Sequence, residues 1–439
     1  MTAAFDGLLV MAIPAAGHSG DESYVYLSVF DTTIEGRVEY PVSDLGEVLG
    51  VEIPQDEEGA IDAIEPLLAE IHGYTLEHLS LGSGSEEWDL SLSDDFRILD
   101  IAAGTYVVIP FEVDRTFDPS VPRIFDAGYD GIIEAKPERV ALLIIETDFG
   151  SGTFQNEADA LLTFTSDNTD QRVDLEDPSF FRGFAAVIGL GVEHIQIGSD
   201  HILFIVALLL PAVLVFTKRA GWEPASSFGA SLWRVTKIAT SFTIAHTITL
   251  TLGGLGIIEI SGSIVEPIIA ISIALAALHN LRPVLFNQEW LVAFGFGLFH
   301  GFGFASLLSG LGLDRTNRVV SLLGFNIGIE RGQIAIILLL FPALFMLRRT
   351  RIYLPIMRWG SVALIVIAVG WFIDRTLGLD IGVDRVVEPL VAWPRPLYIA
   401  AALTVFAVTW YLIERQRNRL IPLDEPEVDV PESREPASV

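Results

Sequence analysis

Two histidines and two acids stand together at the start of a long apolar stretch, GVEHIQIGSDHILFIVALLL. They are Glu193, His194, Asp200 and His201. Ionisable side chains at the mouth of a membrane-length segment cost free energy, so a partner or a bound ion is expected to compensate for them. Because the chain has no cysteine, a transition-metal site would use imidazole and carboxylate ligands.

The spacing of the two histidines leaves two arrangements open. Seven residues are nearly two helical turns, so His194 and His201 would share a helix face. On a straight helix they would lie about 10 Å apart along the axis, too far to bind one ion together. Either the helix breaks at Gly198, or the two histidines are successive stations of a path.

The net negative charge of the chain lies entirely within residues 21–180. Residues 21–180 contain 37 Asp and Glu against 7 Lys and Arg, whereas the rest of the chain contains 20 of each. Acidity with few lysines is typical of salt-adapted proteins, and the alternative is a domain that concentrates cations. The absence of cysteine excludes a disulfide framework, and no nucleic-acid partner is expected.

The sequence of the N-terminal half predicts an extracytoplasmic β-rich domain. Residues 1–17 resemble a cleavable signal peptide. Residues 18–165 contain short runs of alternating apolar residues separated by Gly, Pro and Asp, with one helical insert, which predicts a sandwich-like fold. We find no catalytic constellation in this domain, which is a candidate for binding an extracytoplasmic protein partner. Residues 166–182 are predicted to be a polar linker.

The C-terminal half predicts an α-helical polytopic membrane bundle of about seven transmembrane helices over residues 183–414. Twelve Lys and Arg residues flank one set of segment ends and five the other. The positive-inside rule therefore predicts a cell (inner) membrane protein with the acidic domain outside and the C-terminus inside. Residues 415–439, rich in Pro and acid, are predicted to be a disordered cytoplasmic tail. The predicted spans cover residues 184–216, 231–252, 264–281, 290–309, 319–346, 357–373 and 396–413.

This orientation places polar groups of four segments at a similar depth near the outside. A single membrane histidine can simply hydrogen-bond a neighbouring helix, but a convergence of several favours a functional site. His279 differs, because it lies toward the inner end of its segment. The predicted metal ligands are His194, Asp200, His201, His246 and His300. Glu193, Asn326, Glu330 and His279 are predicted to orient the ligands by hydrogen bonds or to line the path of the ion.

The membrane half resembles the HupE/UreJ family of membrane proteins. The family's first signature, His, five residues, then Asp-His, reads here His194-IQIGS-Asp200-His201. The segments FTIAHTITL, GFGLFHGFGFAS and GFNIGIERGQ are also similar in pattern. The resemblance implies a divalent-metal permease, associated with nickel or cobalt uptake, of the longer branch with an external domain. It implies His194, Asp200, His201 and His300 as motif positions.

The second signature of the smaller permeases agrees only over Phe299-His300-Gly301. Gly303, Phe304, Ala305 and Leu307 stand where that signature has Ala, His, Gly and Glu, so His246 and Glu330 are candidate replacements.

Three functions remain open from the sequence. The first is a nickel-, cobalt- or zinc-type permease, which is not an enzyme. The second is a membrane hydrolase in which the same cluster holds a zinc ion that activates water. The third is a membrane assembly protein whose histidines only lock helices together.

Overall fold

The structure is a computed structural model of the chain. It describes residues 22–101, 103–154, 156, 158–258, 260–283, 288–303, 315–379 and 381–423. The predicted signal peptide and most of the predicted tail lie outside the described residues. The chain divides into two compact parts, which are described separately. The first holds Met1–Leu190, Thr251–Ile258 and Phe304–Gly328, and the second holds Gly191–Leu250, Glu259–Gly303 and Ile329–Val439.

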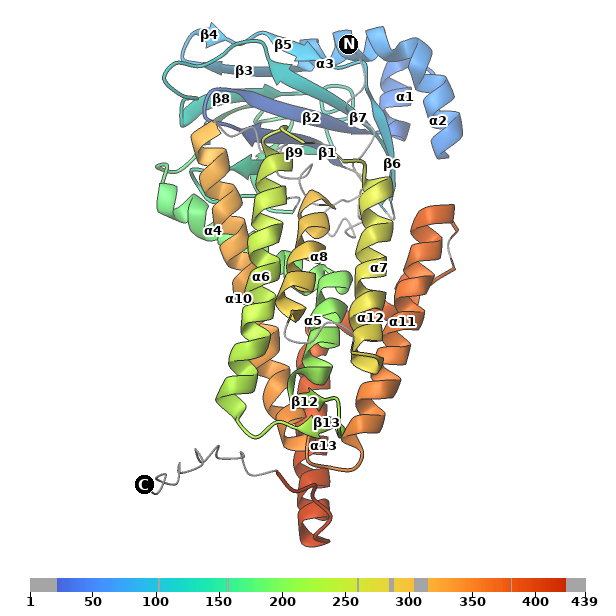
Figure 1. Cartoon of the computed structure of the whole chain (residues 1–439). Coiled ribbons are helices and arrows are strands. Elements are labelled where there is room, and N and C mark those ends of the chain that lie inside the picture. Colours follow the sequence, from blue (N-terminus) through green and yellow to red (C-terminus); the bar gives the residue numbers. More distant parts are fainter. Residues whose placement is uncertain are drawn as a thin grey trace, which may run out of the picture. The chain divides into compact units, whose positions relative to one another are not determined.

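The N-terminal region is β-rich (Figure 1). Its strands are β1 (Glu22–Val29), β2 (Ile34–Pro41), β3 (Leu79–Ser83), β4 (Glu86–Glu87), β5 (Leu90–Leu92), β6 (Arg97–Ile101), β7 (Gly104–Val113), β8 (Ile124–Tyr129), β9 (Val140–Asp148), β10 (Ala160–Phe164) and β11 (Asp170–Asp174). Seven strands form one sheet in the order β10-β9-β1-β2-β7-β5, with β6 also paired to β7. Four form a second sheet, β11-β8-β3-β4.

The two sheets share one hydrophobic core. Val25 of β1 lies in the same cluster as Leu81 of β3 and Phe125 of β8. The alternate residues Tyr24 and Tyr26 of β1 enter a second, smaller cluster on the other face. Successive side chains of a strand point to opposite faces, so β1 is buried on both sides as a central strand of its sheet.

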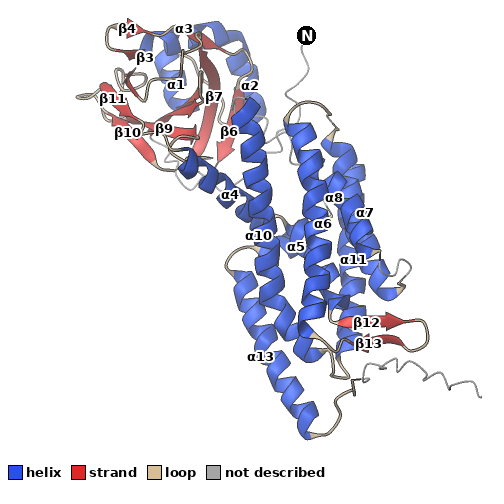
Figure 2. Ribbon diagram, turned by 60° about the vertical axis from the view of Figure 1, so that its left-hand side comes forward, coloured by secondary structure: helices blue, strands red, loops and turns tan. Residues whose placement is uncertain are grey.

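Helices α1 (Val42–Leu49), α2 (Glu57–Ile64) and α3 (Leu68–His78) complete this region (Figure 2). One helical insert was expected, and α1 is additional. It ends at Gly50, whose φ of 68° is the left-handed conformation that glycine adopts without strain. Residues 166–182 were expected to be a linker, but they contain strand β11. This strand forms because its backbone pairs with β8. The β-rich region therefore extends to Asp174, beyond the expected boundary at residue 165.

An ion pair between the partly buried Arg123 and the buried Asp148 lies at the end of β9. The Arg123 guanidinium donates to both carboxylate oxygens of Asp148, at 2.9 and 2.6 Å. Ser151 N also donates to this carboxylate, at 3.2 Å. Burial alone would raise the pKa of Asp148, but these hydrogen bonds and the Arg123 charge hold the pKa below its ordinary value. The pair therefore stabilises the fold with Asp148 ionised.

The C-terminal region is helical. Its elements are α4 (Phe180–Ile197), α5 (Ser199–Ala212), the hairpin β12 (Leu214–Thr217) and β13 (Gly221–Pro224), α6 (Phe228–Gly254), α7 (Gly262–Leu281), α8 (Glu289–Gly303), α10 (Arg315–Leu347), α11 (Tyr353–Leu377), α12 (Asp384–Val391) and α13 (Arg395–Gln416). Within the second part, α7 packs along α11 and against α5 and α8.

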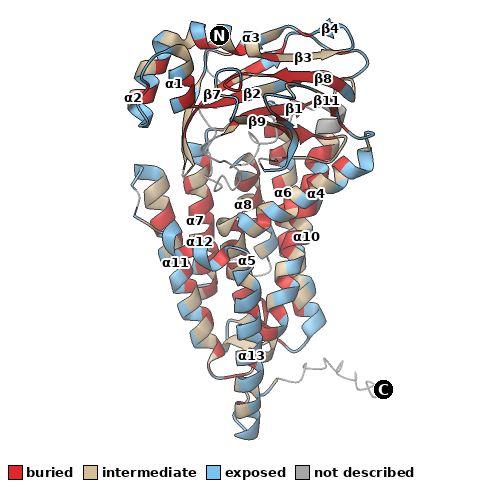
Figure 3. Cartoon of the chain, turned by 180° about the vertical axis from the view of Figure 1, so that it is seen from behind, coloured by how far each residue is buried: buried red, intermediate tan, exposed pale blue. Residues whose placement is uncertain are grey.

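Five described helices are long and apolar enough to cross a membrane, namely Phe180–Ile197, Gly262–Leu281, Val319–Leu347, Tyr353–Leu377 and Arg395–Gln416. Apolar side chains such as Val366 and Val405 are 66% and 67% exposed on these helices. Figure 3 shows exposed residues along α11 and α13. Such surfaces are costly in water and favourable in lipid. The chain is thus of the multi-pass membrane type.

The five helices are fewer than the seven spans expected. Helix α8 is described over 15 residues, up to the end of the described range at Gly303, and α6, although 27 residues long, contains many Thr and Ser residues. The first expected span, residues 184–216, is not one helix. It breaks at Gly198, and its last residues form β12.

Candidate metal centre

The break at Gly198 brings His194 and His201 together. Helix α4 ends at Ile197, and α5 begins at Ser199 with Gly198 as an extended N-cap residue (φ −72°, ψ 91°). The two imidazole centroids lie 4.7 Å apart, less than half the separation expected on a straight helix. Of the two arrangements left open by the spacing, the broken helix is therefore the one observed.

Glycine is required at this break for steric reasons. A Cβ atom at Gly198 would lie 2.7 Å from the His194 carbonyl oxygen and 3.0 Å from Nδ1 of His201. Real Cβ atoms essentially never approach other atoms at the first of these distances. The small residue thus allows the α4 carbonyl and the α5 histidine to meet around it.

His246 of α6 and His300 of α8 complete a cluster of four imidazoles around His201. The His201 centroid lies 5.1 Å from His300 and 6.1 Å from His246, and His194 lies 6.4 Å from His246. His201, His246 and His300 are buried. The structure therefore unites four predicted histidines that are spread over more than 100 residues of sequence.

Two glycines of α8 set the distance between α6 and α8. A Cβ atom at Gly297 would lie 2.3 Å from the Phe242 carbonyl oxygen. One at Gly301 would lie 2.2 Å from Oγ1 of Thr249 and 2.4 Å from the His246 carbonyl oxygen. Small residues on facing helices permit this close packing. Gly297 and Gly301 do so on one seam, whereas Gly295 faces open space.

The cluster contains two potential ligand sets that share His201. The first is His194, His201 and His246, and the second is Asp200, His201 and His300. In each set, one nitrogen or oxygen from every residue lies within 4.8 Å of the others. These are the neutral imidazole and carboxylate donors that nickel, cobalt and zinc accept.

Asp200 fixes the orientation of the His201 ring. Its Oδ1 lies 2.9 Å from His201 Nδ1 and also accepts from the His201 backbone N–H at 2.8 Å. A carboxylate at Nδ1 favours the tautomer in which that nitrogen carries the proton. The Nε2 atom is then left with its lone pair, and this buried atom has no hydrogen-bond partner among the described residues.

Ser272 of α7 fixes the orientation of the His300 ring. The Ser272 hydroxyl donates to the Ile269 carbonyl oxygen at 2.6 Å and lies 3.1 Å from His300 Nε2. A hydroxyl has one hydrogen, so His300 Nε2–H must be the donor to Ser272 Oγ. The lone pair therefore resides on His300 Nδ1, which is buried without a hydrogen-bond partner in the described part of the chain. Sequence reasoning missed Ser272, whose only signal is a lone hydroxyl in an apolar run.

The remaining predicted residues take other positions. Glu193 is exposed. Glu330 accepts a 2.5 Å hydrogen bond from Thr240, which lies six residues, or about 9 Å along α6, from His246. Asn326 belongs to the first part and donates to Leu322 of its own helix at 2.7 Å. His279 lines a separate cavity. These four residues lie outside the two potential ligand sets.

Apolar helices of membrane-spanning length and a buried histidine–aspartate cluster define a polytopic membrane protein with a candidate metal centre. Residues 169–375 match the family model described as HupE / UreJ protein. The match confirms, over these residues, the family expected from the histidine motifs. No curated protein and no solved structure matches the chain.

Proposed function

We propose that the protein is a permease for a divalent transition-metal ion of the nickel or cobalt type. The observation that carries the proposal is the convergence of His194, His201, His246 and His300, contributed by four helices. Two of their ring nitrogens, His201 Nε2 and His300 Nδ1, are buried without a hydrogen-bond partner among the described residues. An unsatisfied buried acceptor costs about 1–3 kcal/mol, and a metal ion would compensate for this cost.

The HupE/UreJ match supports transport as the use of this site, because the family is associated with metal transport in general. A position inside the bundle also suits transport, since intramembrane ionisable residues mark ion pathways. In the proposed topology α4 and α5 form one interrupted span, and α6, α7, α8, α10, α11 and α13 form the others. The distribution of Lys and Arg puts the acidic region outside, where it would attract cations.

The proposal is tested by binding and uptake together. Purified full-length protein should bind cobalt(II) with the visible spectrum of imidazole coordination, and cells producing it should accumulate nickel or cobalt. His201 belongs to both ligand sets, so His201→Ala should abolish the spectrum and the uptake. His72→Ala is the control, because His72 lies in the N-terminal helix α3. Unchanged uptake by His201→Ala at equal membrane abundance would refute the proposal.

A zinc-dependent membrane hydrolase is a second candidate. The observation that favours it is the ligand set His194, His201 and His246, since three histidines hold the zinc of many catalytic sites. Zinc bound there would supply an activated water. The two functions differ in retention of the ion. An enzyme should keep about one zinc per chain through purification and chelation, whereas a permease should release its cargo.

A further inference from the structure

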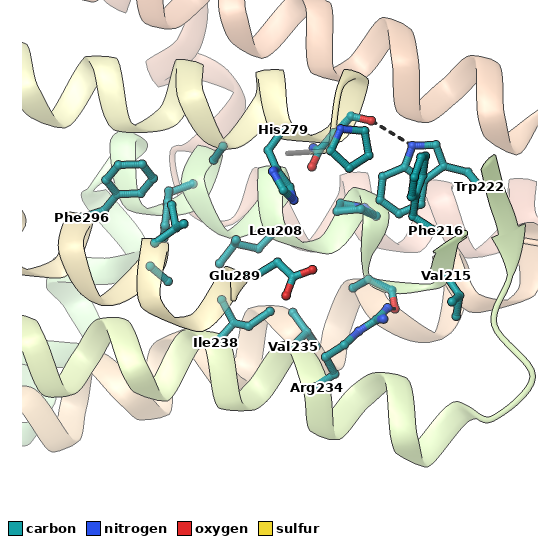
Figure 4. Close-up of a pocket in the computed structure, with 18 of the residues that line it drawn as sticks. Leu208, Val215, Phe216, Trp222, Arg234, Val235, Ile238, His279, Glu289 and Phe296 are labelled. Carbon is teal, nitrogen blue, oxygen red and sulfur yellow. Dashed lines mark hydrogen bonds between the residues drawn. The ribbon is translucent and has the colours of Figure 1, made fainter. Parts of the chain in front are cut away.

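A cavity of about 330 Å³ lies among α5, α6, α7, α8 and the β12–β13 hairpin (Figure 4). Apolar side chains form most of its wall, including Phe204 and Leu208 of α5, Ile238 of α6 and Phe296 of α8. The four clustered histidines are not among its lining residues. The cavity is therefore a separate space within the same part of the chain.

Several polar side chains in the wall already serve the fold. Arg234 Nη2 donates to the carbonyl oxygens of Ala212 and Leu214, at 2.9 and 2.6 Å, where α5 ends. Trp222 Nε1 donates to the Asn280 carbonyl oxygen at 3.1 Å. These groups hold the hairpin and the ends of α5 and α7 in place.

Glu289 and His279 are two further ionisable side chains in the cavity wall. Figure 4 shows the Glu289 carboxylate and the His279 imidazole pointing into the same space from α8 and α7. Both side chains are partly buried. A carboxylate and an imidazole that face one cavity are a suitable donor pair for a divalent transition-metal ion, with water supplying the remaining ligands. The other lining cation, Lys218, is exposed.

A layer of aromatic rings lies where the cavity wall meets the histidine cluster. The Phe204 ring, which lines the cavity, lies 5.9 Å from the His300 ring. It also lies 5.0 Å from Phe242 and 6.1 Å from Phe296. Phe204 and Phe242 are buried. An apolar constriction of this kind resists a hydrated ion and can act as a gate.

We propose that Glu289 and His279 form a second, weaker cation site, which receives the ion from the histidine cluster when the Phe204 layer opens. The inference rests on the proposed permease function and adds to it a release site and a barrier. Two donors instead of three or four predict weaker binding, as release requires. The ligand is the same class of divalent transition-metal ion.

Cobalt binding to the full-length protein tests the second site. Wild type should bind two cobalt ions with different affinities. Glu289→Gln and the conservative His279→Asn should weaken the looser site at least about tenfold while the tighter site remains. His201→Ala should remove the tighter site only. Glu223→Gln is the matched control, because Glu223 lies on the neighbouring hairpin and does not line the cavity.

Cobalt flux into liposomes tests the barrier. Phe204→Ala, or the milder Phe204→Leu if the former misfolds, should raise the flux with both binding sites retained, and Glu289→Gln should lower it. Wild-type binding and flux in both Glu289→Gln and His279→Asn would overturn the second site but leave the permease standing. If wild type neither binds nor transports the ion, the permease proposal itself fails, and the release site with it.

Discussion

The imidazole rings of His194 and His201 lie 4.7 Å apart although seven residues separate them in the chain. The cause is the break between α4 and α5 at Gly198, where the chain passes from one helix to the next in an extended conformation. The relationship changes what the two residues can do. On a straight helix they would be independent stations, whereas here they belong to one potential ligand set.

Replacement of the glycine at the break should therefore impair the site. In Gly198→Ala the new Cβ atom would meet the His194 carbonyl oxygen at 2.7 Å, so the two helix ends must move apart. We expect cobalt affinity to fall at least about tenfold, as for other disturbances around a metal ligand. Gly189→Ala is the control on the same helix α4, because a Cβ atom at Gly189 meets nothing within 4 Å. Equal affinities of the two variants would contradict the role of the break.

Loss of the Asp200 charge should weaken metal binding through His201. Asp200→Leu keeps the approximate size of the side chain but offers no acceptor for a proton on His201 Nδ1. Removal of such a partner typically costs about 10–100-fold in metal affinity. Isothermal titration with cobalt would measure the loss. Nitrogen NMR of labelled histidine in the metal-free protein would show the His201 tautomer, which should change in the variant. An unchanged tautomer would mean that Asp200 does not act through this ring.

The α6–α8 seam predicts a contrast between two neighbouring glycines. Gly301→Ala places a Cβ atom 2.2 Å from Thr249 Oγ1, so α8 must shift and carry His300 away from the cluster. Overpacking of this kind costs about 1–3 kcal/mol of stability. Gly295→Ala adds the same methyl group where nothing lies within 4 Å. Thermal unfolding in detergent should separate the two variants by several degrees, and similar midpoints would contradict this packing.

The Arg123–Asp148 pair predicts a pH dependence for the β-rich region. The pKa of Asp148 is lower in the folded state than in the unfolded chain, so its stabilisation is present above the unfolded value of about 3.8. It is lost as the pH falls through the folded pKa. Asp148→Asn should cost about 2 kcal/mol at pH 7, and this cost should shrink as the pH falls below about 4.

Protease susceptibility of the N-terminal region in the full-length protein would follow this change. Asp126→Asn is the control, because Asp126 and its partner Arg172 are both largely exposed, at 48% and 71% of their side-chain surface. Exposed ion pairs contribute little, about 0–1 kcal/mol. A pH-independent effect of Asp148→Asn would contradict stabilisation of the β-rich region by ionised Asp148.

Much of the fold is readable from the sequence because its periodicities are strong. Strand β7 (Gly104–Val113) coincides with the run GTYVVIPFEV, and the hydrophobic runs of α7, α11 and α13 predict their helices. Short strands such as β6 and β11 are not predicted from the sequence, since they form only by pairing with another strand. Strand β1 illustrates the difference, because its parallel partner β9 lies more than 100 residues later.

The sequence alone determined the chemistry of the candidate site. Four histidines and an aspartate in apolar segments, in a chain without cysteine, already predict imidazole and carboxylate ligands. Only the tertiary structure decided which of them meet. Glycines at positions 198, 297 and 301 act through atoms distant in sequence or across a helix break, and Ser272 orients His300 from another helix. Residue types are local properties, whereas a ligand set is a set of distances, which the packing of separate helices creates.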